Sequence, residues 1–269
     1  MAKISVLGAG SWGTALSVLL NNNGHEVRLW SRFQEEVDTL KQTRELTSKL
    51  PGVHIPDLTA DVKNCVETAE VIVLAVPSPY VRGTAELMAP YVKDEQIIVN
   101  VAKGIEEKTL MTMTDIISEE IPAAGVYVLS GPSHAEEVGR GIPTTCVISG
   151  PKRETAEYLQ GIFMSPVFRV YTTPDTLGVE LGGSLKNVIA LAAGTADGLG
   201  YGDNTKAALI TRGIAEIARL GTKMGAHMET FYGLSGMGDL IVTCASVHSR
   251  NRKAGYLMGK GYTMQQAMD

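Results

Sequence analysis

The sequence has few of the features that mark secreted, membrane or nucleic-acid-binding proteins. Its three cysteines, Cys65, Cys146 and Cys244, are too far apart for a disulfide framework or a metal-binding spacing, so we expect no metal site. Such sparse cysteine usage fits a reducing compartment, and we expect a cytoplasmic protein. The net charge of −5 offers no attraction for nucleic acid or an anionic membrane. No apolar run approaches a membrane span and the first strand pattern begins almost at Met1, so we expect neither a membrane helix nor a signal peptide.

What remains is the composition of an ordinary globular protein. The chain has 269 residues, of which 44% are hydrophobic and 20% charged, enough for one large or two modest domains. Strand and helix patterns alternate as far as Pro174, which predicts an α/β fold with a mainly parallel, doubly wound sheet over residues 1–174. No convincing strand pattern follows, so residues 175–269 are expected to form an all-helical domain. A capping-box pattern, Thr263-Met264-Gln265-Gln266, opens a helix just before the chain stops, which we interpret as a C-terminal truncation.

The glycine-rich stretch Gly8-Ala9-Gly10-Ser11-Trp12-Gly13 lies between a strand pattern at residues 4–7 and a helix pattern at residues 14–20. It matches the dinucleotide-binding pattern G-x-G-x-x-G in the strand-to-helix context that this pattern requires. Gly8 would permit the tight turn, Gly10 the approach of the pyrophosphate, and Gly13 the close packing of helix on strand. The pyrophosphate would then bind at the helix N-terminus. The alternative is an ordinary glycine-rich turn.

The end of the second strand pattern, residues 26–30, bears on the choice of dinucleotide. Folds that select NAD place Asp or Glu there to bond the ribose hydroxyls, but this sequence has Trp30, Ser31 and Arg32. An arginine can pair with the 2′-phosphate of NADP through its planar guanidinium. We therefore expect a preference for NADPH, with use of NAD also open. The alternative is that Arg32 is a solvated surface charge.

Two further strand patterns end in turns that bear candidate polar residues. Residues 97–101 are followed by Ala102-Lys103-Gly104, and residues 126–129 by a turn that contains His134. Lys103 either faces the crevice at the carboxyl ends of the strands or caps the surface, and the spacing leaves both readings open. For His134 we favour a polar residue that opens a helix over a catalytic histidine. The remaining elements expected from periodicity are helices at 34–45, 81–91, 107–121, 175–193 and 204–224, a strand at 71–76, a looser segment from Leu50 to Pro56, and loops at 194–202 and 232–239.

Lys186 lies on the helix expected over residues 175–193, on a face made of small or apolar residues: Gly182, Gly183, Ile189, Ala190 and Ala193. Glycines within a helix cost about 1 kcal/mol each relative to alanine, which suggests close approach of a neighbouring backbone or a ligand. A lysine in such a partly dry pocket would have a lowered pKa, suited to acid–base catalysis. Alternatively, the glycines serve helix packing and Lys186 extends into water.

Several segments together resemble the bacterial NAD(P)-dependent glycerol-3-phosphate dehydrogenases. They occur in the family's order across nearly the whole chain: Gly8 to Leu16, Ala102-Lys103-Gly104, Ser130 to Ala135, Glu180 to Asn187, Gly236-Met237-Gly238-Asp239, and Ser249-Arg250-Asn251. The resemblance implies a Rossmann-like N-terminal domain and a helical C-terminal domain with the active site between them. It also implies that the family continues past Asp269 with more helices. The implied reaction is the reversible reduction of dihydroxyacetone phosphate to sn-glycerol 3-phosphate, which supplies phospholipid synthesis.

The resemblance also implies roles for individual residues. Lys186 would be the catalytic acid and base, and Lys103 would serve both cofactor and substrate. The cofactor would contact Gly8, Gly10, Ser11, Trp12, Gly13, Arg32, Phe33, Ala135 and Arg250. The substrate would contact Gly131, Ser133, Lys186, Asp239, Ser249, Arg250 and Asn251.

Two other functions are compatible with the sequence. One is a related β-hydroxyacid dehydrogenase, which also uses a lysine on a helix, although Ser249-Arg250-Asn251 favours a phosphorylated substrate. The other is a non-catalytic NADPH-binding module. The sequence does not fix the oligomeric state, and a homodimer is suggested only by analogy with other folds of this kind.

Overall fold

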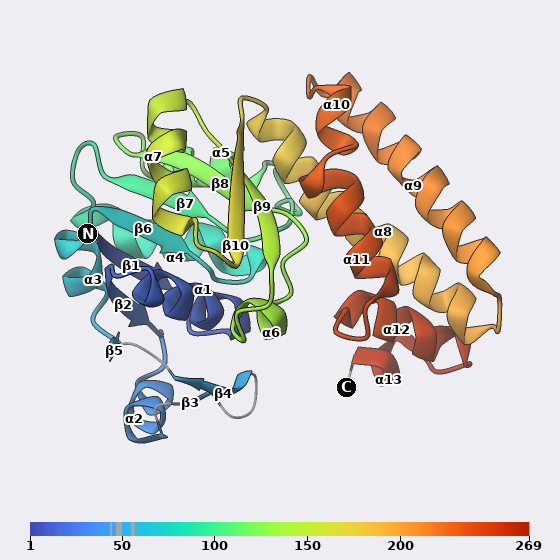
Figure 1. Cartoon of the computed structure of the whole chain (residues 1–269), viewed down its shortest axis with the longest axis horizontal. Coiled ribbons are helices and arrows are strands. Elements are labelled where there is room, and N and C mark those ends of the chain that lie inside the picture. Colours follow the sequence, from blue (N-terminus) through green and yellow to red (C-terminus); the bar gives the residue numbers. More distant parts are fainter. Residues whose placement is uncertain (44, 47–49, 55–56, 269) are drawn as a thin grey trace. The chain divides into compact units, whose positions relative to one another are not determined.

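The computed structural model describes residues 1–43, 45–46, 50–54 and 57–268. The chain forms two compact units, one comprising Met1–Leu129 with Ser133–Pro174 and the other Ser130–Pro132 with Asp175–Asp269. The first unit contains an eight-stranded sheet, and the described residues of the second unit after Pro174 are helical or irregular (Figure 1). An α/β Rossmann-like sheet followed by a helical region confirms the predicted fold class.

The sheet has the strand order β10-β9-β8-β7-β6-β1-β2-β5. Pairing is parallel between β1 and its neighbours β2 and β6, and also in the pairs β2–β5, β6–β7, β7–β8 and β9–β10. The chain order reverses on the two sides of β1, and such a switch point is where doubly wound sheets bind ligands at the carboxyl ends of their strands. The strands are β1 (Lys3–Leu7), β2 (Glu26–Trp30), β5 (Asp57–Thr59), β6 (Val71–Leu74), β7 (Ile97–Asn100), β8 (Gly125–Ser130), β9 (Thr144–Ser149) and β10 (Phe168–Thr173).

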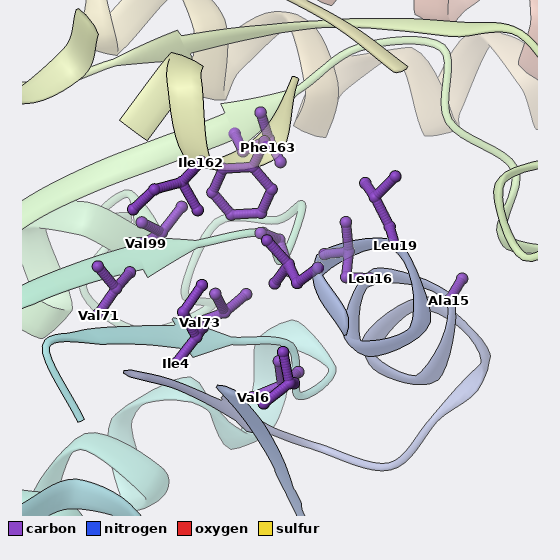
Figure 2. Close-up of a cluster of buried hydrophobic side chains, with 14 of the residues drawn as sticks. Ile4, Val6, Ala15, Leu16, Leu19, Val71, Val73, Val99, Ile162 and Phe163 are labelled. Carbon is purple, nitrogen blue, oxygen red and sulfur yellow. The ribbon is translucent and has the colours of Figure 1, made fainter. Parts of the chain in front are cut away.

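Helices cover both faces of this sheet, and each face has its own buried apolar cluster. On one face, Leu16 and Leu19 of α1 (Ser11–Asn22) and Phe163 of α7 (Arg153–Phe163) pack over strand residues such as Val73 (Figure 2). The other face is covered by α3 (Val62–Thr68), α4 (Val81–Met88) and α5 (Met113–Glu120). Because both faces are buried, the central strands are continuous apolar runs rather than alternating ones.

Several helices of this unit differ from the expected bounds. The helix expected over residues 81–91 is α4, which ends at Met88 and is followed by the 3-10 helix η2 (Ala89–Tyr91). The helix expected over residues 107–121 begins only at Met113, because Leu110 has a φ of +60° and Thr112 caps α5 through a bond from the Asp115 N–H to its hydroxyl (3.4 Å). The helix expected over residues 34–45 is α2 (Gln34–Thr43), which ends earlier because Glu45 lies in β3 (Glu45–Leu46). β3 pairs antiparallel with β4 (Leu50–His54), so part of the segment expected to be loose is a strand, while Ile55 and Pro56 lie outside the described residues.

The second unit is built around α8 (Thr176–Gly198) and α9 (Asp203–Lys223). The loop expected at residues 232–239 is instead the π-helix η3 (Leu234–Gly238) followed by α11 (Asp239–Ala245). The remaining helices are α10 (Met228–Phe231), α12 (Arg250–Gly259) and α13 (Met264–Met268). The predicted capping box is confirmed, since the Gln266 N–H donates to the Thr263 hydroxyl (3.3 Å) and the Thr263 N–H to Gln266 Oε1 (2.9 Å). Within the described residues, no helix is long and apolar enough to cross a membrane.

The longest helix, α8, continues through Gly194 and Gly198, which were expected to lie in a loop. A Cβ atom on Gly194 would lie 2.0 Å from the carbonyl oxygen of Arg252 in α12, and one on Gly255 of α12 would lie 2.0 Å from the Leu191 oxygen of α8. One turn further along, a Cβ on Gly198 would lie 2.3 Å from the Tyr256 oxygen and one on Gly259 2.4 Å from the Thr195 oxygen. The glycines therefore let the two helix backbones touch, and this packing outweighs their low helix propensity.

Candidate active site

The three glycines of the N-terminal turn have different structural surroundings. Gly8 has a φ of +122°, and a Cβ there would lie 2.8 Å from the backbone of Ala75, just after β6. A Cβ on Gly13 would lie 2.0 Å from the Gly8 oxygen. Gly10 is different, because no atom lies within 4 Å of the place of its Cβ. It is the N-cap of α1 and supplies no side-chain cap, so the residues present fit a pyrophosphate at this helix N-terminus.

The residues after β2 divide into one that faces inward and two that face solvent. Ser31 is buried, donates to the Glu36 carboxylate and accepts from the Phe33 N–H (3.2 Å). Arg32 is exposed, and the Phe33 side chain is 67% exposed. The Glu36 carboxylate is thus engaged with Ser31, whereas the Arg32 side chain is exposed and accessible to a ligand at this end of the sheet.

Lys103 lies half-buried in the segment that follows β7. Its neighbour Gly104 packs so closely on the turn after β6 that a Cβ would lie 2.5 Å from the Ser78 side chain. Because Gly8 packs on Ala75 of that same turn, the loops after β1, β6 and β7 meet at the carboxyl edge of the sheet. This is the edge at which one of the two readings of Lys103 places its side chain.

The turn after β8 contains Gly131, which has a φ of +148° and is buried, and Ser133, which is half-buried. His134 occupies the N-cap position of α6 (Ala135–Val138), the place of a polar residue that opens a helix. Ala135 is buried, and α6 packs against α1, the helix of the glycine turn.

In the second unit, Lys186 is buried on α8, with an exposed fraction of 7%. Its Nζ donates to Oδ1 of Asp239 (2.5 Å) and to the hydroxyl of Thr243 (2.8 Å). The Thr243 hydroxyl in turn donates to the Asp239 carbonyl oxygen (2.6 Å), one turn back on α11. Lys186 therefore does not extend into water, since two buried acceptors on one helix fix its amine.

The small-residue face around Lys186 allows the close approach of a neighbouring backbone at Gly182. A Cβ there would lie 2.7 Å from the Ser235 oxygen, so the close neighbour is the backbone of η3. Cys244, next to Thr243, is fully buried, and this burial raises the pKa of its thiol to about 11 although the Lys186 ammonium lowers it. The thiol is therefore neutral at pH 7 and is no nucleophile.

Ser249-Arg250-Asn251 forms the start of α12. The Ser249 hydroxyl, which is buried, accepts from the Arg252 N–H (3.2 Å), so this serine is the N-cap. Arg250 is exposed and Asn251 half-buried. The Arg252 guanidinium is held by Oδ2 of Asp197 on α8 (2.7 and 3.0 Å), which leaves Arg250 as the exposed guanidinium of this first turn.

Sequence reasoning missed Thr243. Its signal was the spacing of four residues from Asp239, which places both side chains on one helical face. That spacing carried no meaning while residues 232–239 were expected to form a loop and no helix was expected after them.

The chain was compared with known protein families, proteins and structures. Residues 3–156 match the family described as the N-terminus of NAD-dependent glycerol-3-phosphate dehydrogenase, and residues 175–269 match its C-terminus. The chain belongs to this family. The resemblance seen in the sequence motifs is therefore confirmed, and so is the dependence on NAD or NADP that it implied.

Named relatives cover nearly the whole chain. The glycerol-3-phosphate dehydrogenase [NAD(P)+] of Agathobacter rectalis is 62% identical over 99% of this chain and 80% of its own length. That of Fusobacterium nucleatum is 59% identical over 100% of this chain and 82% of its own length. The crystal structure of glycerol-3-phosphate dehydrogenase from Coxiella burnetii has a TM-score of 0.95 at 36% identity and covers 99% of this chain and 83% of that one.

Proposed function

We propose that the protein interconverts dihydroxyacetone phosphate and sn-glycerol 3-phosphate with NAD(P)H, as a cytoplasmic supplier of glycerol 3-phosphate for phospholipid synthesis. One observation carries the proposal. Within a family of glycerol-3-phosphate dehydrogenases, Lys186 is buried and its amine is oriented by Asp239 and Thr243. An amine held at a fixed place can donate or accept a proton at one defined position of the substrate.

The reaction requires positive charge and a proton at the substrate's carbonyl oxygen. When bound, NAD(P)H supplies the hydride for the carbonyl carbon. Negative charge then develops on the oxygen, and the Lys186 ammonium stabilises that charge and donates its proton. In the reverse direction the amine accepts the proton of the hydroxyl. One such donor lowers the barrier by about 3 kcal/mol. Asp239 and Thr243 accept hydrogen bonds from the amine and so hold it in one orientation.

The first turn of α12 is the proposed site for the substrate phosphate. Exposed Arg250 presents a planar guanidinium that can bind two phosphate oxygens, at a helix N-terminus whose dipole favours an anion. Ser249 accepts from the Arg252 N–H and keeps its own O–H to donate to the phosphate. The other proposed substrate contacts are Lys103, Gly131, Ser133, Asp239 and Asn251.

The glycine turn and the residues after β2 support the proposed cofactor site. The open space at Gly10 suits the pyrophosphate, and exposed Arg32 suits the 2′-phosphate of NADPH, which we propose as the preferred cofactor. Phe33 is exposed and can stack on the adenine ring. Ser11, Trp12, Lys103, Ala135 and Arg250 complete the proposed cofactor contacts.

The test is a spectrophotometric assay at 340 nm with NADPH and NADH in parallel, each with dihydroxyacetone phosphate or unphosphorylated dihydroxyacetone. We expect oxidation of both cofactors with the phosphorylated ketone, a higher kcat/KM with NADPH, and little turnover of the unphosphorylated ketone. Cofactor binding without oxidation would identify a non-catalytic module. Similar turnover of both ketones would indicate a related hydroxyacid dehydrogenase. Light scattering on the same sample tests the proposed homodimer.

A further inference from the structure

The segment that carries Lys103 is a closed turn between β7 and α5. The Glu106 N–H donates to the Met111 oxygen (3.0 Å), and Ile105 forms an isolated bridge with Thr112. These bonds hold the turn together internally. These internal bonds do not connect the turn to the sheet, so its position relative to the sheet must come from contacts with other elements.

On the N-terminal side of Lys103, the sheet itself supplies that contact. The Asn100 side chain is fully buried at the end of β7 and bonds both backbone groups of Ala102, accepting from its N–H (3.1 Å) and donating to its oxygen (3.0 Å). These two bonds fix the backbone on the N-terminal side of Lys103 to the sheet. Directly after Lys103, Gly104 packs on Ser78.

Further along on the C-terminal side, the segment is also held by Arg82 of α4. Its Nε and Nη2 each lie 2.8 Å from one carboxylate oxygen of Glu106, in a two-point pair. Its Nη1 also pairs with Glu119 (2.6 Å) and with Glu120, both in the last turn of α5. A single guanidinium thus joins three elements: the first turn of α4, the Lys103 segment and the end of α5.

The charges around Arg82 make this contact more than an ordinary surface pair. Glu119 and Glu120 already lie at a helix C-terminus, where the dipole disfavours negative charge. Without the guanidinium, Glu106 would face two like charges and be repelled from α5. By contrast, Arg153 pairs with Glu157 (2.7 Å) on the exposed surface of α7, and that pair links no second element.

We propose that Arg82 is a positioning residue for the reaction: through Glu106 it holds the Lys103 segment at the carboxyl edge of the sheet. This inference rests on the function proposed above, in which Lys103 contacts substrate and cofactor. In this proposal Arg82 acts only through the segment, by its pair with Glu106.

The test is a double-mutant cycle between Arg82→Met and Lys103→Met, with kcat/KM for dihydroxyacetone phosphate as the readout. We expect Arg82→Met alone to lower kcat/KM by roughly tenfold to a hundredfold, because small misplacements of a substrate-positioning group have effects of this size. In the Lys103→Met background the same change should have almost no further effect. Arg82→Lys keeps the charge but cannot pair at two points, so it should give an intermediate loss. Arg153→Met is the matched control and should keep wild-type kinetics.

Each contrary outcome is distinct. Wild-type kinetics for Arg82→Met overturn the inference, as does an equal loss in both backgrounds, which indicates a general effect on stability. If Arg82→Met does not fold, Glu106→Gln takes its place in the cycle, since it keeps the size of the side chain and removes its charge. Wild-type kcat/KM for Lys103→Met would instead refute the proposed role of Lys103, whatever the Arg82 variants do.

Discussion

The contact between α8 and α12 gives a prediction of stability whose size follows from the structure. Replacing Gly194 with alanine adds a Cβ atom 2.0 Å from the carbonyl oxygen of Arg252. A carbon atom needs roughly 1 Å more than that even at the shortest approach, so the two helices must separate along their glycine contact. Gly161 on α7 offers a matched control, because no atom lies within 4 Å of its Cβ position.

The two substitutions should change stability in opposite directions. Alanine is favoured over glycine inside a helix by about 1 kcal/mol, and Gly161→Ala should show this gain alone. In Gly194→Ala the gain is opposed by overpacking, which costs about 1–3 kcal/mol, and by the loss of close packing at the neighbouring glycines. We therefore expect Gly194→Ala to be destabilised by about 1–2 kcal/mol net and Gly161→Ala to be stabilised by about 1 kcal/mol.

Urea unfolding followed by circular dichroism measures both changes through the shift of the midpoint. The same Gly194→Ala protein should show a raised KM for dihydroxyacetone phosphate, because α12 carries Ser249-Arg250-Asn251 and moves with the contact. The interpretation that these glycines permit close contact between α8 and α12 would be refuted if Gly194→Ala were as stable as wild type, or if its free energy of unfolding rose as much as that of Gly161→Ala.

Three further predictions concern separate parts of the molecule. Hydrogen bonds from Arg82 and, to a smaller extent, from Thr109 hold the pKa of Glu106 at about 2 instead of 4.5, so these contacts contribute stability that is present above about pH 4.5 and is lost as the pH falls toward 2. An NMR titration of Arg82→Met should show the pKa of Glu106 raised toward 4.5, and an unchanged value would contradict the pairing. Burial raises the pKa of the Cys65 thiol to about 12 and that of Cys244 to about 11, and Cys146 is also buried, so none of the three should react with a thiol reagent at pH 8 until urea unfolds the chain; labelling of native protein would disprove this. Arg32→Glu should raise KM for NADPH by tenfold or more, because it removes one charge-assisted contact to the 2′-phosphate, and should change KM for NADH less. Equal changes in the two KM values would mean that Arg32 does not bind the 2′-phosphate.

Patterns that depend on local sequence predicted much of the fold. The mainly apolar runs at β1, β6, β7 and β8 were recognisable because strands buried on both faces leave little polar alternation. The positions of Gly8 and Gly13 also agree with their expected physical reasons, a positive φ and a close backbone contact. The capping box at Thr263 was readable because both of its partners lie within four residues.

Features that depend on contacts between distant segments were not predictable. Gly194 and Gly198 indicated a loop by propensity, and only the presence of α12 explains why the helix continues. The hydrogen bond from Lys186 to Thr243 joins residues 57 positions apart, and the local sequence around either residue does not predict it. Likewise Arg82 gave no sign in the sequence of its three carboxylate partners, because these lie on two other elements.

The claim on which the account depends is that Lys186 delivers and accepts the proton. Its most direct test is Lys186→Met, assayed at 340 nm with dihydroxyacetone phosphate and NADPH, with cofactor binding measured in parallel by NADPH fluorescence. We expect kcat to fall by about a hundredfold to a thousandfold, as for the loss of one oxyanion-stabilising donor, while the Kd for NADPH changes little. Turnover near the wild-type rate, or an equal loss of turnover and cofactor binding, would contradict this claim.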